Sequence, residues 1–231
     1  RHIRSSEIPH AVIIDATASD QVAEEYLGWF KVGVHVITPN KRANAGDYDY
    51  YQELRQVAAK MNRNYYYETT VCAGLPVIKT LQDLIHTGDE VLAIDAVLSG
   101  TLAYIFSELG AGKSFSEAVI SAKEAGYTEP DPRSDLSGMD VARKIVCLAR
   151  EMGLTIGIDQ IAVESLVPPE LNSLSVSEFI KKLPSYDEQI SQQLQAVTNP
   201  GEVLHYVAQI RSPNEVIVGL QSYPKDHPMG Q

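Results

Sequence analysis

The sequence has few cysteines and lacks several patterns that mark common protein classes. Its 231 residues include only two cysteines, Cys72 and Cys147, which form no CxxC or Cys/His ligand pattern. That fits a reducing compartment and gives no indication of structural zinc. The six histidines form no metal-ligand spacing either. No apolar run approaches the roughly 18 residues that a membrane-spanning helix requires, so we expect a globular protein without a membrane partner.

Blocks of like charge are also absent, although the chain is acidic. The formal net charge is −11 and the isoelectric point is about 5.0. We therefore expect no nucleic-acid partner and no anionic membrane surface. The N-terminus lacks the apolar segment of a signal peptide, and the first residue is Arg1 rather than methionine. We expect a cytoplasmic protein, or a plastid protein in a plant-like source, whose chain begins inside a longer parent.

The glycine-rich GxGxxG turn of dinucleotide-binding sheets occurs nowhere in the chain. The strand–helix alternation of such sheets is nevertheless present. Predicted strands lie at residues 11–17, 33–40 and 64–71, with predicted helices between them at 20–31 and 47–63. Right-handed crossovers would make this a parallel sheet, which binds ligands beyond the carboxyl ends of its strands. If the sheet binds a nucleotide, we expect its phosphate loop upstream of Arg1.

From about residue 75 the pattern becomes a mixture of helices and strands. Helices are expected at residues 77–86, 101–109, 115–125, 137–152 and 176–183, and strands at 91–98, 203–210 and 215–220. The expected fold is α/β. A partial Rossmann-like parallel nucleotide-binding sheet over residues 1–74 precedes an α+β substrate-binding and dimerisation domain over residues 75–231.

The stretch GYTEPDPRSDLSGMDVARK combines seven ionisable side chains with two prolines. We expect Pro130 and Pro132 to hold the chain extended, and a helix to start at Ser137 with Asp140 completing a capping box. Asp140 and Lys144 would then lie one turn apart on the polar face of that helix. A surface ion pair would explain these two residues by themselves. A lysine beside carboxylates also suits proton transfer to a reacting carbonyl.

This stretch closely resembles the signature of homoserine dehydrogenases, and the resemblance covers nearly the whole chain. The segments ITPNK, ETTVCAGLP, TGDE and LSGTLAYIF match the family, while VESLVP, GEVLHYVA and DHP match it more weakly. VESLVP and DHP look like the dehydrogenase part of bifunctional aspartokinase–homoserine dehydrogenases. The resemblance implies a chain truncated at both ends and a homodimer or higher homo-oligomer. It also implies NADP- or NAD-dependent interconversion of L-homoserine and L-aspartate 4-semialdehyde, on the route to threonine, methionine and isoleucine.

The resemblance further implies an active site. Lys144 matches the family's catalytic lysine, Asp140 matches its close partner, and Lys41 matches a second lysine between cofactor and substrate. The implied substrate-binding residues are Thr101, Glu129 and Asp135, and the implied cofactor-binding residues are Thr17, Ala18 and Lys41. Taken without the resemblance, Lys41 also suits a solvated turn, and Thr101 suits a residue that satisfies amides at a helix N-terminus.

A monovalent cation site, for sodium by preference, is implied in ETTVCAGLP. Its ligands would be Glu68 and the main-chain carbonyls of Val71, Ala73 and Leu75. Such an all-oxygen set suits a hard cation. Taken without the resemblance, Glu68 at a strand end is more typical of a residue that caps a loop.

Two residues depart from the family pattern. Cys72 stands where the family has glycine, so we expect its side chain to strain the loop or crowd the nicotinamide. We hypothesise that Cys72 weakens cofactor binding. Ser134 replaces an aspartate, with a smaller expected effect because Asp135 remains. The alternative function is a non-catalytic homologue or fragment that keeps the dimer interface and substrate pocket without a working cofactor site.

Overall fold

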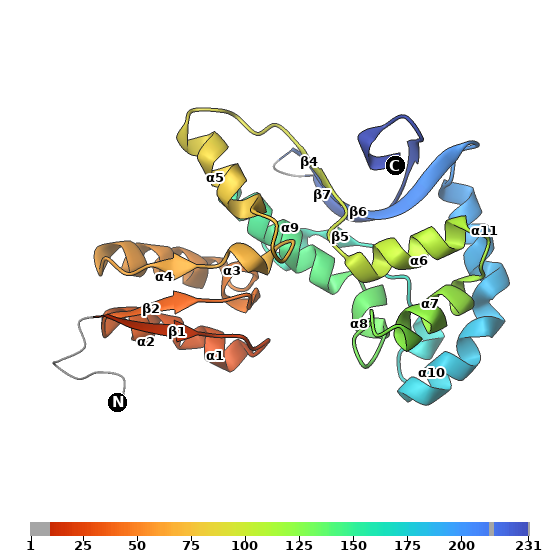
Figure 1. The fold of residues 1–231 in the computed structure, drawn as a ribbon, viewed down its shortest axis with the longest axis horizontal. Helices are drawn as coiled ribbons and strands as arrows, with labels where there is room; N and C mark the ends of the chain where they lie inside the picture. Colours follow the sequence, from red (N-terminus) through yellow and green to blue (C-terminus); the bar gives the residue numbers. More distant parts are fainter. Residues whose placement is uncertain (1–9, 213–214, 231) are drawn as a thin grey trace. The chain divides into compact units, whose positions relative to one another are not determined.

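The computed structural model describes residues 10–212 and 215–230, which divide into two compact units (Figure 1). Unit 1 comprises the described residues up to Leu92 together with Arg143–Gln160, and unit 2 comprises Ala93–Ala142 and the described residues from Ile161 onward. The units therefore change at residue 92 rather than 74, and a later segment returns to unit 1. The division into functional domains at residue 74 stays a prediction.

Unit 1 contains the expected parallel sheet. Its strands are β1 (Ala11–Ile14), β2 (Val34–Ile37) and β3 (Tyr65–Tyr66), hydrogen-bonded in the order β1-β2-β3. The crossovers contain α1 (Asp20–Glu24), α2 (Tyr26–Lys31), α3 (Arg42–Ala45) and α4 (Tyr48–Lys60). The strands are shorter than predicted, because the chain leaves the sheet soon after the apolar residues of each strand.

The crossover helices cover one face of this sheet. Phe30 of α2, Val36 of β2 and Leu54 of α4 are fully buried in one apolar cluster. Burial of such side chains contributes about 1.5–3 kcal/mol each. The other face leaves Val12 and Ile14 of β1 50% and 70% exposed. Two right-handed crossovers that advance in the same direction place both helical layers on the same side.

A buried carboxylate connects three helical segments of unit 1. The side chain of Glu151, on α9 (Met139–Glu151), is 3% exposed. It accepts hydrogen bonds from Arg55 of α4 (2.7 Å), from the Tyr67 hydroxyl (2.9 Å) and from Gln82 of α5 (Val77–His86; 2.8 Å). A buried charge with its hydrogen bonds satisfied rigidifies its surroundings. These bonds account for the return of residues 143–160 to unit 1.

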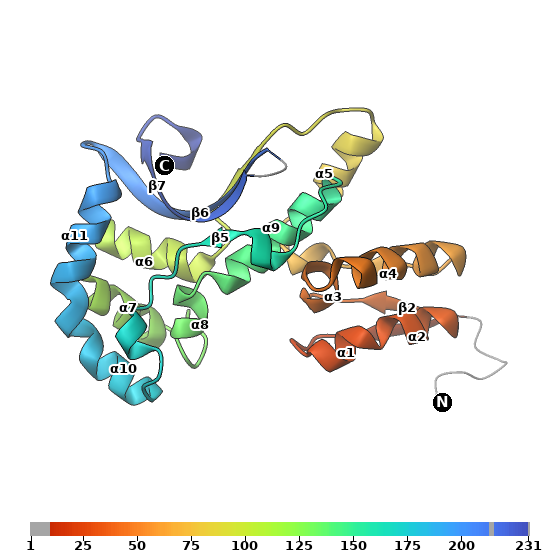
Figure 2. The ribbon, with the colours of Figure 1, turned by 180° about the vertical axis from the view of Figure 1, so that it is seen from behind.

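Unit 2 is an α+β arrangement, as expected. Its sheet has the order β4-β6-β7-β5, with β6 antiparallel to β4 and β7, and β5 parallel to β7. The strands are β4 (Ile94–Ala96), β5 (Ala162–Val163), β6 (Glu202–Ser212) and β7 (Glu215–Pro224). Figure 2 shows the long β6–β7 hairpin curving over α6 (Gly100–Gly110). The other helices are α7 (Phe115–Glu124), α8 (Arg133–Leu136), α10 (Val176–Lys182) and α11 (Asp187–Val197).

Local capping explains where several of these helices begin. Ser114 and Ser175 form capping boxes with Glu117 and Glu178 at the starts of α7 and α10. Helix α11 was not predicted, because its polar DEQISQQLQAV sequence carries little apolar periodicity. Among the described residues, no helix is long and apolar enough to cross a membrane.

Two predictions about the acidic stretch are wrong. Pro132 is not extended: its φ and ψ are −59° and −20°, and it immediately precedes α8. Proline suits this place because a helix start needs no amide donor. Helix α9 begins at Met139 rather than Ser137, which is the C-cap of α8. Gly138 separates the two helices with φ +71°, a conformation that glycine adopts without strain.

Candidate active site

Buried Asp15 holds the loops that follow β1 and β2. Asp15 is 3% exposed and accepts hydrogen bonds from the main-chain N–H of Thr17 (2.8 Å), the amide of Asn40 (3.0 Å) and the hydroxyl of Tyr26. The Thr38 hydroxyl donates to the Asp15 carbonyl (2.9 Å). Burial acts to raise the pKa of Asp15, but the hydrogen bonds favour its carboxylate and bring the pKa below its ordinary value. Both strand-end loops are therefore tied to one buried charge.

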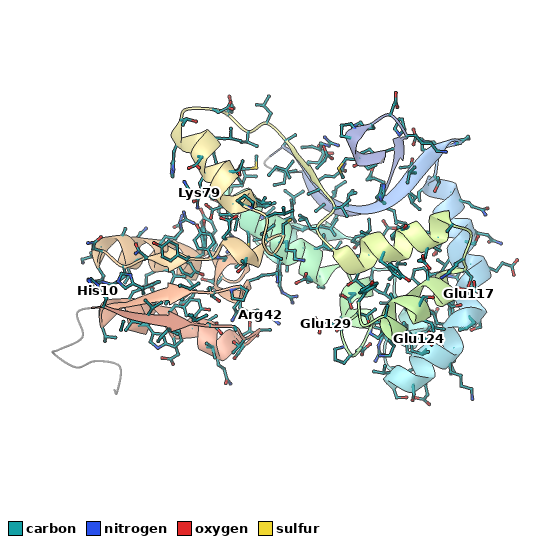
Figure 3. The ribbon with its side chains drawn as sticks, in the orientation of Figure 1. His10, Arg42, Lys79, Glu117, Glu124 and Glu129 are labelled. Carbon is teal, nitrogen blue, oxygen red and sulfur yellow. The ribbon has the colours of Figure 1, made fainter. Side chains whose placement is uncertain are left out.

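This network places Thr17, Ala18 and Lys41 in neighbouring loops of unit 1. Asn40, which bonds to Asp15, also accepts a hydrogen bond on Oδ1 from the main-chain N–H of Arg42 (3.0 Å). The backbone is thus held on both sides of Lys41. Figure 3 shows Arg42 at the start of α3, next to this loop. The three predicted cofactor-side residues therefore lie beyond the carboxyl ends of adjacent parallel strands, where ligands of such sheets bind.

Lys144 lies on the part of α9 that belongs to unit 1. Its charge acts on the Cys72 thiol, and the charge of Lys41 acts on the buried Cys147 thiol. Burial raises the pKa of both thiols, that of Cys147 to about 12, and nearby positive charges act in the opposite direction. Cys147 follows Lys144 by one helical turn. The charge of Lys41 therefore acts on a thiol of α9, and the charge of Lys144 acts on the Cys72 thiol in the loop before α5.

The loop with the predicted cation ligands adopts a strained backbone. Cys72 and Ala73 have φ values of +57° and +47°, a left-handed conformation that costs an L-residue about 1–2 kcal/mol. The family's glycine would adopt it without that cost. The expectation that Cys72 strains the loop is therefore confirmed.

Glu68 stabilises the start of α5. Its two carboxylate oxygens accept hydrogen bonds from the main-chain N–H groups of Ile78 (2.8 Å) and Lys79 (2.9 Å). This is the capping role that the residue type alone favours, at the positive end of the helix dipole. A carboxylate has about four acceptor positions, so capping leaves room for a cation. Across residues 10–212 and 215–230, no three His, Cys, Asp or Glu side chains group as metal ligands.

Unit 2 brings the predicted substrate-binding residues together. The Thr101 hydroxyl lies 2.6 Å from the Tyr127 carbonyl and is also within hydrogen-bonding reach of the Asp135 carboxylate. The main-chain N–H of Glu129 donates to Asp135 (2.8 Å). Burial raises the pKa of Asp135, and the charge of Asp140 adds to that rise. Figure 3 shows Glu129 on the loop that precedes α8. The Asp135 carboxylate therefore lies beside the half-buried Thr101 hydroxyl, within the influence of the Asp140 charge.

Thr101 does not cap α6. Ser99 fills that role, because its hydroxyl accepts a hydrogen bond from the main-chain N–H of Leu102 (3.2 Å). The structural alternative for Thr101 is therefore wrong, and its side chain points to the acidic segment instead.

Arg133 anchors the acidic segment to a distant part of unit 2. It donates to the Asp131 carboxylate through Nε and Nη2, at 2.9 and 2.7 Å. Its Nη1 donates to the carbonyls of Leu171 (3.0 Å), Asn172 (2.9 Å) and Leu174 (2.8 Å). Bidentate pairing of this kind fixes geometry as well as charge. The signature arginine therefore holds the segment in shape rather than facing the acidic cluster.

The predicted residues thus fall into two groups, one in each unit. Thr17, Ala18, Lys41, Lys144 and residues 68–75 belong to unit 1, whereas Thr101, Glu129, Asp135 and Asp140 belong to unit 2. Asp140 and Lys144 are four residues apart on α9, so they lie on the same side of that helix.

Sequence reasoning missed the residues that hold these groups in place, notably Asp15, Tyr26 and Arg133. Asp15 carried a usable signal, because a lone acid that ends an apolar strand run needs hydrogen-bonding partners. Tyr26 carried none, since its partner is eleven residues away on another element.

Comparison with known proteins assigns the family. Residues 76–231 match the family model described as homoserine dehydrogenase. Residues 4–68 match the model described as the homoserine dehydrogenase NAD binding domain. The two matches together span most of the chain and meet between residues 68 and 76.

Curated relatives are similar over nearly the whole chain. It is 48% identical over 226 residues to bifunctional aspartokinase/homoserine dehydrogenase 2, chloroplastic, of Arabidopsis thaliana. The aligned region covers 97% of this chain and 25% of the relative. It is 42% identical over 228 residues to the homoserine dehydrogenase of Emericella nidulans, which covers 94% of this chain and 62% of the relative. The chain therefore spans about a quarter of the plant relative and less than two thirds of the fungal one.

A solved structure has the same fold. The crystal structure of a Candida auris protein of unknown function superimposes with a TM-score of 0.88 at 39% sequence identity, covering 96% of this chain and 64% of that one. Because the homoserine dehydrogenase model alone matches well over half of the residues, this chain belongs to the homoserine dehydrogenase family.

Proposed function

We propose that the chain is part of a dehydrogenase that interconverts L-homoserine and L-aspartate 4-semialdehyde with NADP or NAD. The observation that carries the proposal is the cluster of Thr101, Glu129, Asp135 and Asp140 in a chain of this family. The names of the curated relatives support the same activity.

The acidic cluster suits the amino-acid part of the substrate. An ammonium group offers three donors and a positive charge, and carboxylates are its strongest acceptors. Asp135 has a raised pKa, because burial and Asp140 disfavour its charged form. A bound ammonium would relieve that repulsion, so substrate binding and ionisation of the cluster would reinforce one another. The Thr101 hydroxyl would fix the orientation of the bound group.

Lys144 would supply the proton that the carbonyl oxygen takes up as the semialdehyde is reduced. A positioned general acid contributes about 10²–10⁴-fold to rate. Asp140 lies one turn earlier on α9, and its negative charge would stabilise the protonated lysine. Lys41 would lie between cofactor and substrate and add a second positive charge near the developing alkoxide.

Thr17, Ala18 and Lys41 would contact the nicotinamide side of the cofactor. Their position beyond the carboxyl ends of β1 and β2, and the match of residues 4–68 to an NAD binding domain, support this assignment. When bound, the nicotinamide supplies or accepts the hydride. The buried hydrogen bonds of Asp15 and Asn40 would keep these loops in place before the cofactor arrives.

A monovalent cation, sodium by preference, would bind Glu68 and the carbonyls of Val71, Ala73 and Leu75. The free acceptor positions on Glu68 and the all-oxygen donor set support this part of the proposal. We further propose a homodimer or higher homo-oligomer. The compartment is proposed as cytoplasmic, or as the plastid in a plant-like source, since the Arabidopsis relative is named chloroplastic.

The strained Cys72 favours a second candidate function. Cys72 stands at a left-handed position, and we propose that its side chain would narrow the space beside the predicted nicotinamide site. The second candidate is a protein that keeps the substrate pocket and dimer interface without turnover.

Substrate-dependent reduction of NADP⁺ or NAD⁺ by the full-length protein tests the proposal. We expect reduced cofactor to appear with L-homoserine and far more slowly with 4-hydroxybutanoate, which lacks the ammonium group. Asp135→Asn should narrow the difference between the two alcohols. Equal rates with both alcohols would contradict the role of the acidic cluster, and no turnover by a folded protein would favour the second candidate.

A further inference from the structure

Arg150 of α9 is a buried cation that serves main-chain carbonyls. Arg150 is 4% exposed. Its guanidinium donates to the carbonyls of Asn44 (2.8 Å), Gly46 (2.8 Å) and Ile156 (3.1 and 2.9 Å). A charge removed from water is tolerated only when its donors are satisfied in this way. Two of the three carbonyls belong to the turn that contains α3.

The rings of Tyr48 and Tyr51 hold the guanidinium in this orientation. Its central carbon lies 5.2 and 5.1 Å from the two ring centroids. Contacts of this kind between arginine and aromatic rings are attractive, and more so where they are shielded from water. Both tyrosines follow the α3 turn at the start of α4, so the end of that turn and the first turn of α4 contact Arg150.

Helix α3 needs an external partner because it is a single turn. It begins directly after Lys41, whose carbonyl accepts hydrogen bonds from the main-chain N–H groups of Asn44 (3.1 Å) and Ala45 (2.8 Å). A helix leaves its last four carbonyls without intrahelical donors, and Arg150 supplies donors to this end of α3. The turn is also tight, since a Cβ on Gly46 would lie 2.6 Å from the Arg42 carbonyl oxygen.

Arg150 therefore joins the turn that begins at Lys41 to the helix that carries Lys144. Both lysines and Arg150 belong to unit 1. The influence of the Lys41 charge on Cys147, also on α9, is consistent with this packing. Resting on the function proposed above, we propose that Arg150 is a positioning residue that sets the spacing of Lys41 and Lys144 for proton transfer.

The adjacent Glu151 provides a matched control. It lies on the same helix and its side chain is 3% exposed, but its hydrogen bonds run to Arg55, Tyr67 and Gln82. Glu151→Gln should weaken unit 1 as a structure, whereas Arg150→Met should also release the α3 turn. Methionine keeps the apolar length of the side chain beside the tyrosines and removes the donors. Arg150→Lys restores the charge with fewer donors, which protects the test against a methionine variant that fails to fold.

Hydrogen exchange measures the docking without reference to activity. The amides of Asn44, Ala45 and Gly46 close the α3 turn. We expect them to exchange about tenfold faster in Arg150→Met, in line with the loss of hydrogen bonds to a buried charge. Arg150→Lys should give an intermediate rate, and Glu151→Gln should leave these amides unchanged relative to the rest of unit 1. Unchanged exchange in a folded Arg150→Met or Arg150→Lys variant would overturn the proposal.

Steady-state kinetics of the full-length protein then test the positioning role. We expect kcat to fall about a hundredfold in Arg150→Met, because a misplaced reacting group costs a factor of that order. The KM for L-homoserine should change little, since the acidic cluster lies in unit 2. Arg150→Lys should recover part of kcat, and Glu151→Gln should retain most of it. Equal losses of kcat in Arg150→Met and Glu151→Gln would overturn the proposal. A wild-type protein without turnover would instead refute the proposed function, and hydrogen exchange would still decide the docking.

Discussion

Replacing Asp15 by asparagine tests whether one buried charge organises the strand-end loops. The carboxylate accepts hydrogen bonds from Thr17, Tyr26 and Asn40. Asparagine keeps the shape and one acceptor oxygen but turns an N–H donor toward groups that also donate. The variant loses at least one hydrogen bond to a charged acceptor, which is worth about 1.5–3 kcal/mol. The remaining hydrogen bonds then have a neutral acceptor and are weaker. We expect the free energy of unfolding of unit 1 to fall by about 2–4 kcal/mol.

The single tryptophan makes this loss measurable in unit 1. Trp29 lies on α2 with its ring 5.4 Å from that of Tyr26, so its fluorescence follows unfolding beside the network. Urea titration gives the free energy from the transition midpoint and slope. Asp20→Asn is the control: Asp20 is 67% exposed and lies 3.4 Å from Arg42, a pair worth at most about 1 kcal/mol. A loss for Asp15→Asn no larger than for Asp20→Asn would refute the reasoning.

The pH dependence of the free energy of unfolding provides a second test with the same variant. The folded-state pKa of Asp15 lies below its ordinary value, which is about 3.9 in an unfolded chain. The stability that this carboxylate contributes is therefore present above that unfolded pKa and lost as the pH falls through the folded pKa. The difference between wild type and Asp15→Asn should accordingly be constant near neutral pH and shrink below about pH 4. A difference that stays constant into acid would contradict the assigned charge.

Three further predictions concern other sites. Cys72→Gly relieves the left-handed strain of the loop; it should tighten cofactor binding in the full-length protein by calorimetry, and an unchanged affinity would refute the idea that Cys72 weakens it. Gly138→Ala should lower the free energy of unfolding of unit 2 by more than about 2 kcal/mol, because the added Cβ would lie 2.0 Å from the Tyr206 hydroxyl oxygen. Thermal unfolding measures this loss, and the additional change Tyr206→Phe should recover part of it. No recovery would rule out the clash as the cause. The folded-state pKa of Asp135 is raised, so the contribution of Asp135 to stability falls as the pH rises from the unfolded pKa to the folded pKa. Asp135→Asn should therefore raise the urea midpoint at neutral pH, and it should also raise the KM for L-homoserine. A lower urea midpoint would contradict the assigned direction of the pKa shift.

The parallel sheet could be predicted because it depends on local patterns. Apolar, β-branched runs such as AVIIDAT place strands directly, and the crossover spacing sets their direction. The helix start at Ser137 could not be placed in this way. The residue types of a capping box were present, but Gly138 in a left-handed conformation turns the chain between α8 and α9. The decision between these conformations depends on tertiary packing against Tyr206, which no local pattern records.

The candidate site shows the same division. The charged residues around Asp140 stood out because the stretch combines seven ionisable side chains with two prolines and resembles the homoserine dehydrogenase signature. The arginines Arg133 and Arg150 were assigned no role from the sequence. Their partners include main-chain carbonyls 38 to 41 residues away from Arg133 and 104 to 106 residues away from Arg150. Sequence reasoning therefore identified groups suited to chemistry, while the structure was needed to identify the groups that position them.

The central claim is that Lys144 transfers the proton in a homoserine dehydrogenase reaction. The most direct test compares L-homoserine-dependent formation of reduced cofactor by the full-length wild type, Lys144→Met and Lys123→Met. Lys123 is the control because its Nζ donates to the Pro130 carbonyl at 2.6 Å, and it is not among the predicted catalytic residues. We predict that kcat falls about 10²–10⁴-fold in Lys144→Met, as expected for loss of a general acid, and changes by less than about tenfold in Lys123→Met. Comparable kcat values for wild type and a folded Lys144→Met would contradict the account.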